Sequence, residues 1–252
     1  MQRSQKPPVV VLIPAFNEEE SLPFVLSAIP KVWVQKVIVC NNGSTDRTAE
    51  VARMMGATVV NATRRGYGTA CLAGINYLKS LPKEAQPEIV VFLDGDYSDY
   101  PDDLPDVVSP VLNGEKDLVI GSRLLGDLEP GAMTLPQRFG NWLAPFLIRL
   151  LYGYRFTDLG PFRAIRWDKL LMLNMSDPNY GWTVEMQIKA AQLRFRCAEV
   201  PVRYRKRAAG KSKVSGTVKG VALAAWKIIG LIFVLYWRNA PPKSEFENKI
   251  YP

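Results

Sequence analysis

The chain has 252 residues, 48% of them apolar, a length and composition that suit one large globular domain with its own core. It contains no histidine, which excludes Ser-His-Asp catalysis, imidazole acid–base chemistry and zinc sites that need imidazole. The net charge of +8 favours anionic partners, such as nucleic acid, an anionic membrane surface or phosphorylated substrates.

Apolar runs and helical patterns alternate through the first half of the chain. Five runs without apolar–polar alternation predict buried strands, at 8–13, 36–40, 58–60, 88–94 and 117–123. The segments between them carry helix signals, such as Gly56 after the second pattern and Pro101 at the start of the fourth. We therefore predict an α/β fold with a mostly parallel sheet and helices on both faces.

Polar residues follow directly on four of these strands. They are Asn41 and Asn42, Arg64 and Arg65, Asp94 and Asp96, and Ser122 and Arg123. Ligands bind at the carboxyl ends of the strands in such sheets, so we expect these side chains to share one edge.

The pattern changes after residue 125. A Gly/Pro-rich loop leads to an apolar helix at 141–153, and a last strand is predicted within 196–204. The apolar segment 221–237 has 17 residues, fewer than the roughly 20 of a membrane span, and Lys227 interrupts it. Two interpretations remain open for this segment: an amphipathic helix in a membrane interface, or a terminal helix packed on the core.

The stretch FLDGDYSDYPDDL at 92–104 concentrates negative charge in a basic chain. Asp94 and Asp96 end a buried strand, where two carboxylates so close together repel each other unless they share a cation. No histidine or cysteine lies nearby, so the preferred ion is Mg²⁺ or Mn²⁺. Asp99, Asp102 and Asp103 precede or begin a helix, and we interpret them as residues that stabilise its N-terminus.

The positive charges gather late in the chain. Seven lysines and arginines fall within 17 residues, at Arg203, Arg205, Lys206, Arg207, Lys211, Lys213 and Lys219. Arg123 and Arg138 are two further cations without an obvious local acid partner. Such residues either bind phosphates or form ordinary solvated surface and salt bridges.

Other signals limit the cofactor and the compartment. The RRGYG segment lacks the third glycine of a dinucleotide fingerprint, since Cys71 stands there, and no Walker-type motif is present. The cysteines match neither a disulfide framework nor a metal-ligand pair, which favours a reducing compartment. The N-terminal apolar run is too short for a signal peptide. We expect a cytoplasmic protein, free or peripheral on the cytoplasmic face of a membrane.

Seven short motifs in one order resemble a known family. PAFNEEESL, NNGSTDRT, GYGTA, FLDGDYSDYP, GSR, TDLGPFRAIR and EVPVRYRKRAAGKSK, spread over residues 9–216, are similar to the inverting glycosyltransferases of family 2 with the GT-A fold. The resemblance is greatest to the dolichyl-phosphate mannose or glucose synthase branch. It implies metal-dependent transfer of a sugar from a nucleotide diphosphate sugar to an acceptor, which is a polyprenyl phosphate in that branch.

The resemblance also implies roles for individual residues. The donor would be held by Pro14, Ala15, Asn17, Glu18, Asn42, Asp46, Asp94, Arg163, Arg207, Lys211, Ser212 and Lys213, and we add Arg64 and Gly66 to this set. The metal would be held by Asp96, with Asp94 and Ser98 as its other candidate ligands. The acceptor phosphate would be held by Arg123 and Arg138. Asp96, Asp158, Glu185 and Arg138 are the candidate catalytic residues.

Two departures from the family pattern affect specificity. The family usually shows two aspartates where this chain has Asn41 and Asn42; an amide oxygen can still accept the N3–H of uracil, so we expect a UDP-sugar. Ser98 stands where relatives often have glutamine. We expect the catalytic domain to span residues 1–216 and the C-terminal helix and tail, which we expect to contact a membrane or pack on the core, to span 217–252.

The mechanism depends on the acceptor. The charge developing on the nucleoside diphosphate would be stabilised by the divalent ion with Arg207, Lys211 and Lys213. A phosphate acceptor is already ionised and needs no general base, whereas a hydroxyl acceptor would need Asp158 or Glu185 to take its proton. This use of the basic cluster favours a phosphorylated substrate over nucleic acid. The sequence leaves a homo-oligomer open.

Three other functions compete with this prediction. A strand ending in D-x-D is also typical of haloacid dehalogenase-type phosphatases, but there the motif usually follows the first strand. A noncatalytic membrane-surface or nucleic-acid binder would leave the acidic pair unexplained. A sugar-phosphate nucleotidyltransferase would need a glycine-rich loop after its first strand, which is missing here.

Overall fold

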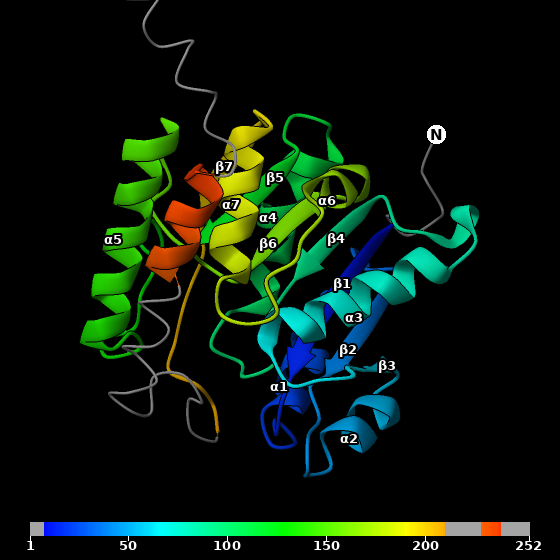
Figure 1. The fold of residues 1–252 in the computed structure, drawn as a ribbon. Helices are drawn as coiled ribbons and strands as arrows, with labels where there is room; N and C mark the ends of the chain where they lie inside the picture. The colour runs from blue at the N-terminus through cyan, green and yellow to red at the C-terminus, as the bar shows by residue number, and fades with distance from the viewer. Residues whose placement is uncertain (1–7, 210–227, 238–252) are drawn as a thin grey trace, which may run out of the picture.

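The structure, a computed structural model, describes residues 8–209 and 228–237. Within these residues, seven strands form one sheet in the order β3-β2-β1-β4-β6-β5-β7 (Figure 1). The strands are β1 (Val9–Ala15), β2 (Lys36–Asn41), β3 (Thr58–Asn61), β4 (Ile89–Phe92), β5 (Leu118–Ser122), β6 (Arg163–Arg166) and β7 (Cys197–Pro201). The helices are α1 (Leu22–Ala28), α2 (Thr48–Met54), α3 (Tyr67–Ser80), α4 (Leu104–Leu112), α5 (Leu135–Tyr152), α6 (Trp167–Leu173) and α7 (Trp182–Gln192), with 3-10 turns η1 (Lys83–Ala85) and η2 (Pro101–Asp103).

The prediction of a mostly parallel sheet is confirmed. β1 pairs in parallel with β2 and β4, β2 with β3, and β5 with β7. β6 runs antiparallel between β4 and β5, and it is not among the strands that the sequence predicts. Its four residues, RAIR, are too few and too charged to show a strand pattern, because both of its ends are arginines.

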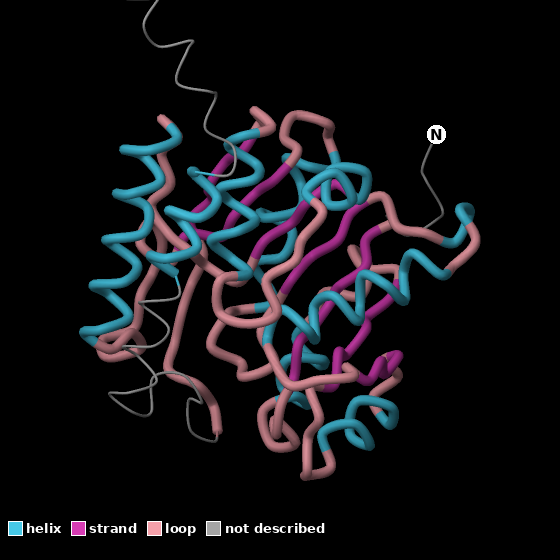
Figure 2. The backbone as a smooth tube through the Cα atoms, in the orientation of Figure 1, coloured by secondary structure: helices cyan, strands magenta, loops and turns pink. Residues whose placement is uncertain are grey.

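Alternation along β1 explains why helices cover both faces of the sheet. Val9, Val11 and Ile13 point into one apolar cluster, which α1, α2 and α4 complete, while Val10 and Leu12 point into a second cluster. Helices α3, α5, α6 and α7 complete that second cluster, and Figure 2 shows helices on both sides of the strands. The predicted layers are therefore confirmed.

Helix α5 begins earlier than the sequence pattern predicts. Thr134 and Gln137 form a capping box at its N-terminus, and Gly153 ends it in the left-handed conformation at φ 69°. The helix therefore extends back to the edge of the sheet where the polar residues lie.

The described part of the C-terminal segment, residues 228–237, is helical. It packs on the core through Ile232 and Leu235, and the Tyr152 hydroxyl donates a hydrogen bond to the Ile232 carbonyl at 2.8 Å. The other residues of the predicted tail, 217–227 and 238–252, lie outside the described residues. Across the part of the chain that the structure describes, no helix is both long enough and apolar enough to cross a membrane.

Candidate active site

A pocket of about 520 Å³ lies at the carboxyl ends of β1, β2, β4 and β5, where the sequence predicts the site. Its lining includes the predicted residues Pro14, Ala15, Glu18, Asn42, Gly66, Asp94, Asp96, Arg123 and Arg207. These side chains come from loops far apart in the sequence. The parallel strands bring them together, because each loop starts at the same edge of the sheet.

Asp94 and Asp96 are held in different ways. The Tyr67 hydroxyl donates to Asp94 Oδ1 at 2.9 Å, and the Ser98 backbone N–H donates to Asp96 Oδ1 at 2.9 Å. Burial, and then the charge of Asp96, raise the pKa of Asp94 to about 7. Ser98 itself is buried and does not line the pocket, so it supports Asp96 through its backbone.

Arg207 brings a positive charge to this acidic pair. Its Nη2 lies 2.6 Å from Glu18 Oε1 and 3.3 Å from Asp96 Oδ2. The preceding Arg205 lies against the ring of Tyr97, with its guanidinium carbon 3.5 Å from the ring centroid, and its Nε donates to the Tyr97 carbonyl at 2.8 Å. Stacking of Arg205 therefore fixes the segment that carries Arg207 against the loop after β4.

The first two loops are tied to each other. The Thr45 N–H donates to Asn17 Oδ1 at 2.8 Å, and Asn17 N–H donates to Ser44 Oγ at 3.1 Å. Asn42 lines the pocket and accepts the Gly66 N–H at 2.8 Å. Of these two residues, both predicted to contact the nucleoside, Asn42 lines the pocket and Asn17 joins the two loops.

Asp46 accepts hydrogen bonds at the start of α2. It accepts the backbone N–H groups of Thr48 and Glu19 at 3.0 and 3.2 Å. Burial alone would raise the pKa of Asp46, but these hydrogen bonds and the Thr48 hydroxyl lower it overall. Asp46 is not part of the pocket lining, and its predicted contact with the nucleoside stays a prediction.

The loop after β3 presents a different arginine from the predicted one. Arg65 lines the pocket, with its guanidinium carbon 4.7 Å from the Phe16 ring centroid, whereas Arg64 lies outside the lining. Gly66 has φ 147°, and a Cβ there would lie 2.2 Å from the Pro178 carbonyl oxygen. A glycine is therefore required where this loop turns into α3.

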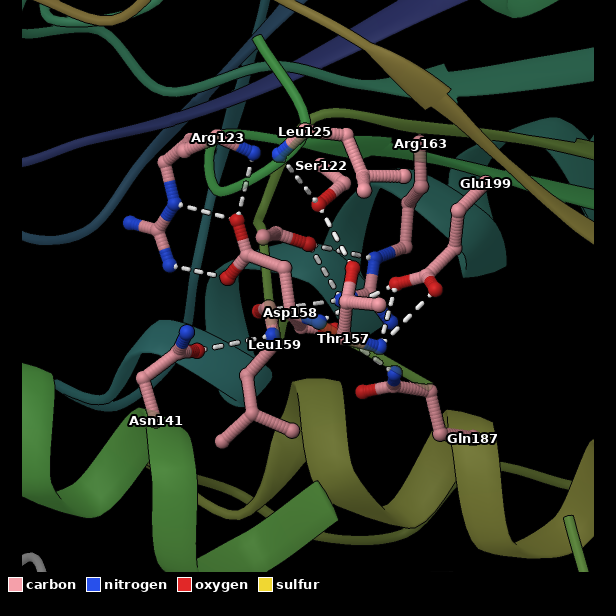
Figure 3. Close-up of polar contacts among 11 residues, drawn as sticks. Ser122, Arg123, Leu125, Asn141, Thr157, Asp158, Leu159, Arg163, Gln187 and Glu199 are labelled. Atoms are coloured by element: carbon pink, nitrogen blue, oxygen red, sulfur yellow. Dashed lines mark hydrogen bonds and ion pairs between the residues drawn. The ribbon is translucent and has the colours of Figure 1, made fainter. Parts of the chain in front are cut away.

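Arg123 has an acid partner after all, and it is Asp158 (Figure 3). Arg123 Nε and Nη2 donate to Asp158 Oδ2 and Oδ1 at 2.8 and 2.6 Å, and the Arg123 backbone N–H also donates to Oδ2. Burial would raise the pKa of Asp158, but Arg123 lowers it overall. Asp158 is fully buried with both oxygens engaged, which argues against its predicted role as a general base.

Glu185 is engaged in a similar way. It is 1% exposed and accepts hydrogen bonds from Ser176 and Asp177. It also forms an ion pair with Lys189 at 2.7 Å. These contacts fix the loop before α7. The pocket lining does not include Glu185, so its predicted proton-accepting role is not supported either.

Arg163 lies beneath the pocket instead of in it. Its guanidinium donates to the backbone carbonyls of Leu159, Gly160 and Thr183, and the side chain is fully buried. Burial lowers the pKa of Arg163 to about 10. Because Leu159 and Thr183 line the pocket, Arg163 positions the pocket floor.

Two groups of predicted residues lie further out. Arg138 is exposed on α5, next to Gln137, which lines the pocket. Lys211, Ser212 and Lys213 lie outside the described residues.

Three pocket residues are not predicted by the sequence: Tyr67, Trp182 and Tyr204. Arg65 is expected at this edge of the sheet, but no role is assigned to it. Tyr67 could have been found from its place in the GYG motif at the start of a helix. Trp182 and Tyr204 have no such signal in one sequence, because only the fold brings α7 and the segment after β7 to this edge.

Asp99, Asp102 and Asp103 do not behave as one group. Asp103 pairs with Arg203 and Asp102 is exposed, whereas Asp99 is 2% exposed and neither of its carboxyl oxygens has a partner within the described residues. Burial, and then the charge of Asp94, raise the pKa of Asp99 well above its usual value. The prediction that Asp99 stabilises a helix N-terminus is therefore wrong, since η2 starts two residues later without a side-chain cap from it.

The acidic pair fits a divalent ion only together with another ligand. In residues 8–209 and 228–237, no three aspartate, glutamate or cysteine side chains meet as a metal centre. The guanidinium of Arg207 between Glu18 and Asp96 shows that this point of the pocket favours a cation. Oxygens of a bound diphosphate and water would complete the coordination that Asp94 and Asp96 begin.

The fold and pocket thus define an α/β protein whose site combines an acidic pair with arginines at the carboxyl ends of its strands. The family model described as Glycosyl transferase family 2 matches residues 10–173. The chain is 38% identical over 226 residues to an uncharacterized glycosyltransferase of Mycobacterium tuberculosis, covering 88% of this chain and 97% of that protein. This chain belongs to glycosyl transferase family 2 and is a glycosyltransferase.

A named relative and a solved structure are similar to the chain as well. The chain is 30% identical to the undecaprenyl-phosphate mannosyltransferase of Micrococcus luteus over 229 residues, covering 85% of this chain and 90% of that protein. Its fold matches that of glucosyl-3-phosphoglycerate synthase from M. tuberculosis, solved with Mn²⁺, UDP and glucosyl-3-phosphoglycerate, with a TM-score of 0.72 and 23% identity. That match covers 96% of this chain and 83% of the other.

Proposed function

We propose that this glycosyltransferase moves a sugar, with inversion, from a UDP-sugar to a polyprenyl phosphate, using Mn²⁺ or Mg²⁺. The observation that carries the proposal is the meeting of Asp94, Asp96, Glu18 and Arg207 in one pocket. The name of the M. luteus relative supports the lipid-phosphate acceptor, and the UDP bound in the solved neighbour supports the donor.

The pocket suits a nucleoside diphosphate. Asp94 and Asp96 would hold the divalent ion, which supplies positive charge to the leaving diphosphate when it is bound. Arg207 and Arg65 lie on the same lining and would contact the phosphate oxygens directly. Asn42 Oδ1 accepts one hydrogen bond from Gly66 and has a second lone pair that could accept the N3–H of uracil.

The surroundings of the two candidate bases favour a phosphate as the acceptor. Asp158 and Glu185 are both buried and fully hydrogen-bonded, so neither is placed to deprotonate a hydroxyl. A phosphate acceptor is already ionised and needs no base. Arg123, which lines the pocket and is oriented by Asp158, would bind that phosphate, with the exposed Arg138 nearby on α5.

A transfer assay tests the function. The full chain would be incubated with radiolabelled UDP- or GDP-hexoses, Mn²⁺ and either polyprenyl phosphate in detergent or 3-phosphoglycerate, and label would be measured in the organic and aqueous phases. We expect organic-phase label from a UDP-hexose only, lost with EDTA and in Asp96→Ala, and retained in Asp102→Ala, a matched exposed acid. Label on 3-phosphoglycerate alone, or a preference for GDP-hexoses, would overturn the proposed acceptor or donor.

Membership of the family also decides between the alternative functions. The haloacid dehalogenase-type phosphatase and the noncatalytic binder are not favoured, since the family model covers the D-x-D strand and the pocket residues from Pro14 to Pro161. The main question left is therefore which acceptor receives the sugar. The polyprenyl phosphate and 3-phosphoglycerate arms of the assay distinguish these two acceptors.

A further inference from the structure

One face of α5 exposes a continuous row of large apolar side chains. The row, here called the α5 apolar stripe, consists of Leu135, Phe139, Trp142, Phe146 and Leu150. At 3.6 residues per turn these positions fall within an arc of about 80°. The opposite face of the helix is the buried one, with Asn141, Ala144, Pro145 and Ile148. The stripe is thus a second apolar face that the described core does not use.

The stripe is large for an exposed surface. Its side chains are between 49% and 79% exposed, and the Trp142 ring stacks on that of Phe146 at 5.8 Å and lies 5.9 Å from that of Phe139. Aromatic side chains present about 150–250 Å² each, so the stripe exposes on the order of 500 Å² of apolar surface. That is near the largest patch of a typical monomer, roughly 300–600 Å², and such patches usually bind something.

Positive charge borders the stripe. Arg138 and Arg149 are exposed and lie along one edge of it, between the stripe and the buried face. No residue of α5 is acidic. An apolar stripe of Trp, Phe and Leu edged by arginines matches a helix that lies in a membrane interface, where the rings enter the acyl boundary and the guanidiniums reach anionic headgroups.

The neighbouring helical segment has exposed apolar side chains too. Residues 228–237 pack beside the end of α5, where the Tyr152 ring lies 5.9 Å from that of Tyr236. In this segment Phe233, Val234 and Trp237 are exposed. Figure 1 shows α5 as the outermost helix on its side of the molecule, next to this segment.

The geometry points to the α5 apolar stripe as a surface that docks on a bilayer containing anionic lipids. Gln137, in the first turn of the same helix, lines the pocket, so the stripe begins beside the pocket. A lipid phosphate held in the docked bilayer would then lie near Arg138 and the pocket. The biological meaning of this inference rests on the proposed polyprenyl phosphate acceptor, but docking itself is measured without transfer.

Vesicle flotation tests the inference on the full chain. Wild type would be compared with Phe139→Ser/Trp142→Ser/Phe146→Ser and with a matched control, Val32→Ser/Met54→Ser/Leu193→Ser, which removes three exposed apolar side chains elsewhere. Vesicles would be pure phosphatidylcholine or would contain about a third phosphatidylglycerol. We expect the α5 triple variant to lose at least tenfold in partitioning to anionic vesicles and the control to match wild type. Arg149→Ala should reduce the preference for anionic over neutral vesicles.

Several outcomes would overturn the inference. If wild type and the α5 triple variant float equally, a surface other than the α5 apolar stripe attaches the protein to the vesicles. If wild type does not float, the protein does not dock on a bilayer and the inference is wrong. A wild-type dimer in analytical ultracentrifugation that the α5 triple variant dissociates would make a second copy the occupant. An unfolding midpoint in urea equal to that of wild type shows that the α5 triple variant is folded. Loss of flotation is then measured independently of transfer, so it is separate from any failure of the proposed function.

Discussion

Arg207 contacts both Glu18 and Asp96, so it connects the late basic segment to the acidic pair after β4. Its side chain is 17% exposed, and Arg205, stacked on Tyr97, holds the backbone beside it. The guanidinium of Arg207 can exchange its contacts with these carboxylates for contacts with a bound diphosphate while it stays in the pocket.

Replacing Arg207 should weaken donor binding. A hydrogen bond to a charged group contributes about 1.5–3 kcal/mol, so Arg207→Ala should raise the Kd for UDP with Mn²⁺ by roughly 10- to 100-fold. Arg207→Lys should restore part of the affinity, because it keeps the positive charge. It should not restore all of it, because lysine lacks the two parallel N–H donors of the guanidinium. Lys206→Ala, which removes the exposed neighbour, is the control. Calorimetry measures all four proteins, and equal Kd values for Arg207→Ala and wild type would contradict the assigned contact.

Asp99 predicts an unusual pH dependence of stability. Its pKa is raised in the folded state, so its contribution is fully present below the unfolded pKa of about 3.9 and is lost as pH rises through the folded pKa. Asp99→Asn has no carboxyl group to ionise at this position, so its stability does not fall in this way as pH rises. It should be no more stable than wild type near pH 4 and more stable than wild type at pH 8 without metal. Urea unfolding at both pH values measures this. A variant less stable than wild type at pH 8 would mean that Asp99 has a partner in the folded protein.

The sequence predicted the pocket better than it predicted single roles. Asp94, Asp96, Asn42 and Arg123 follow directly on strands, so their position at the sheet edge could be deduced. Asp158 could not be assigned in this way. Whether a polar side chain faces a pocket or a buried partner depends on residues far away in sequence, such as Arg123, and one sequence does not show this pairing.

At the scale of elements, close packing of α3 fixes the pocket wall. Gly68 lies in the first turn of α3, and a Cβ there would lie 1.9 Å from the Asp177 backbone carbonyl oxygen. The loop that contains Asp177 is held by Glu185 on α7. The long strands and helices followed from apolar patterns, but β6 and this loop contact depend on tertiary packing, which leaves no local pattern.

A pair of glycine substitutions tests this packing. Gly68→Ala should destabilise the protein by about 2 kcal/mol or more, since backbone must move to admit the methyl group. Gly140→Ala, in α5 with open space around its Cβ position, should stabilise it by about 0.5–1 kcal/mol through helix propensity. Chemical denaturation of both variants measures the free energy of unfolding. Equal effects of the two substitutions would contradict the close approach of α3 to the loop.

At the scale of the whole molecule, the pocket and the α5 apolar stripe are neighbours. The pocket occupies the carboxyl ends of the strands, the first turn of α5 borders it, and the α5 apolar stripe runs away from it along the helix. The net charge of +8 favours both a diphosphate and an anionic bilayer. The proposed donor would thus enter the pocket while the α5 apolar stripe contacts the lipid that carries the acceptor.

Calorimetric titration of the full chain with UDP, with and without Mn²⁺, tests the central claim most directly. We predict that UDP binds with Mn²⁺, that affinity falls at least tenfold without the metal or in Asp96→Ala, and that Asp102→Ala binds as wild type. UDP binding that is equal with and without Mn²⁺, an Asp96→Ala variant that binds as wild type, or no UDP binding at all would contradict the account.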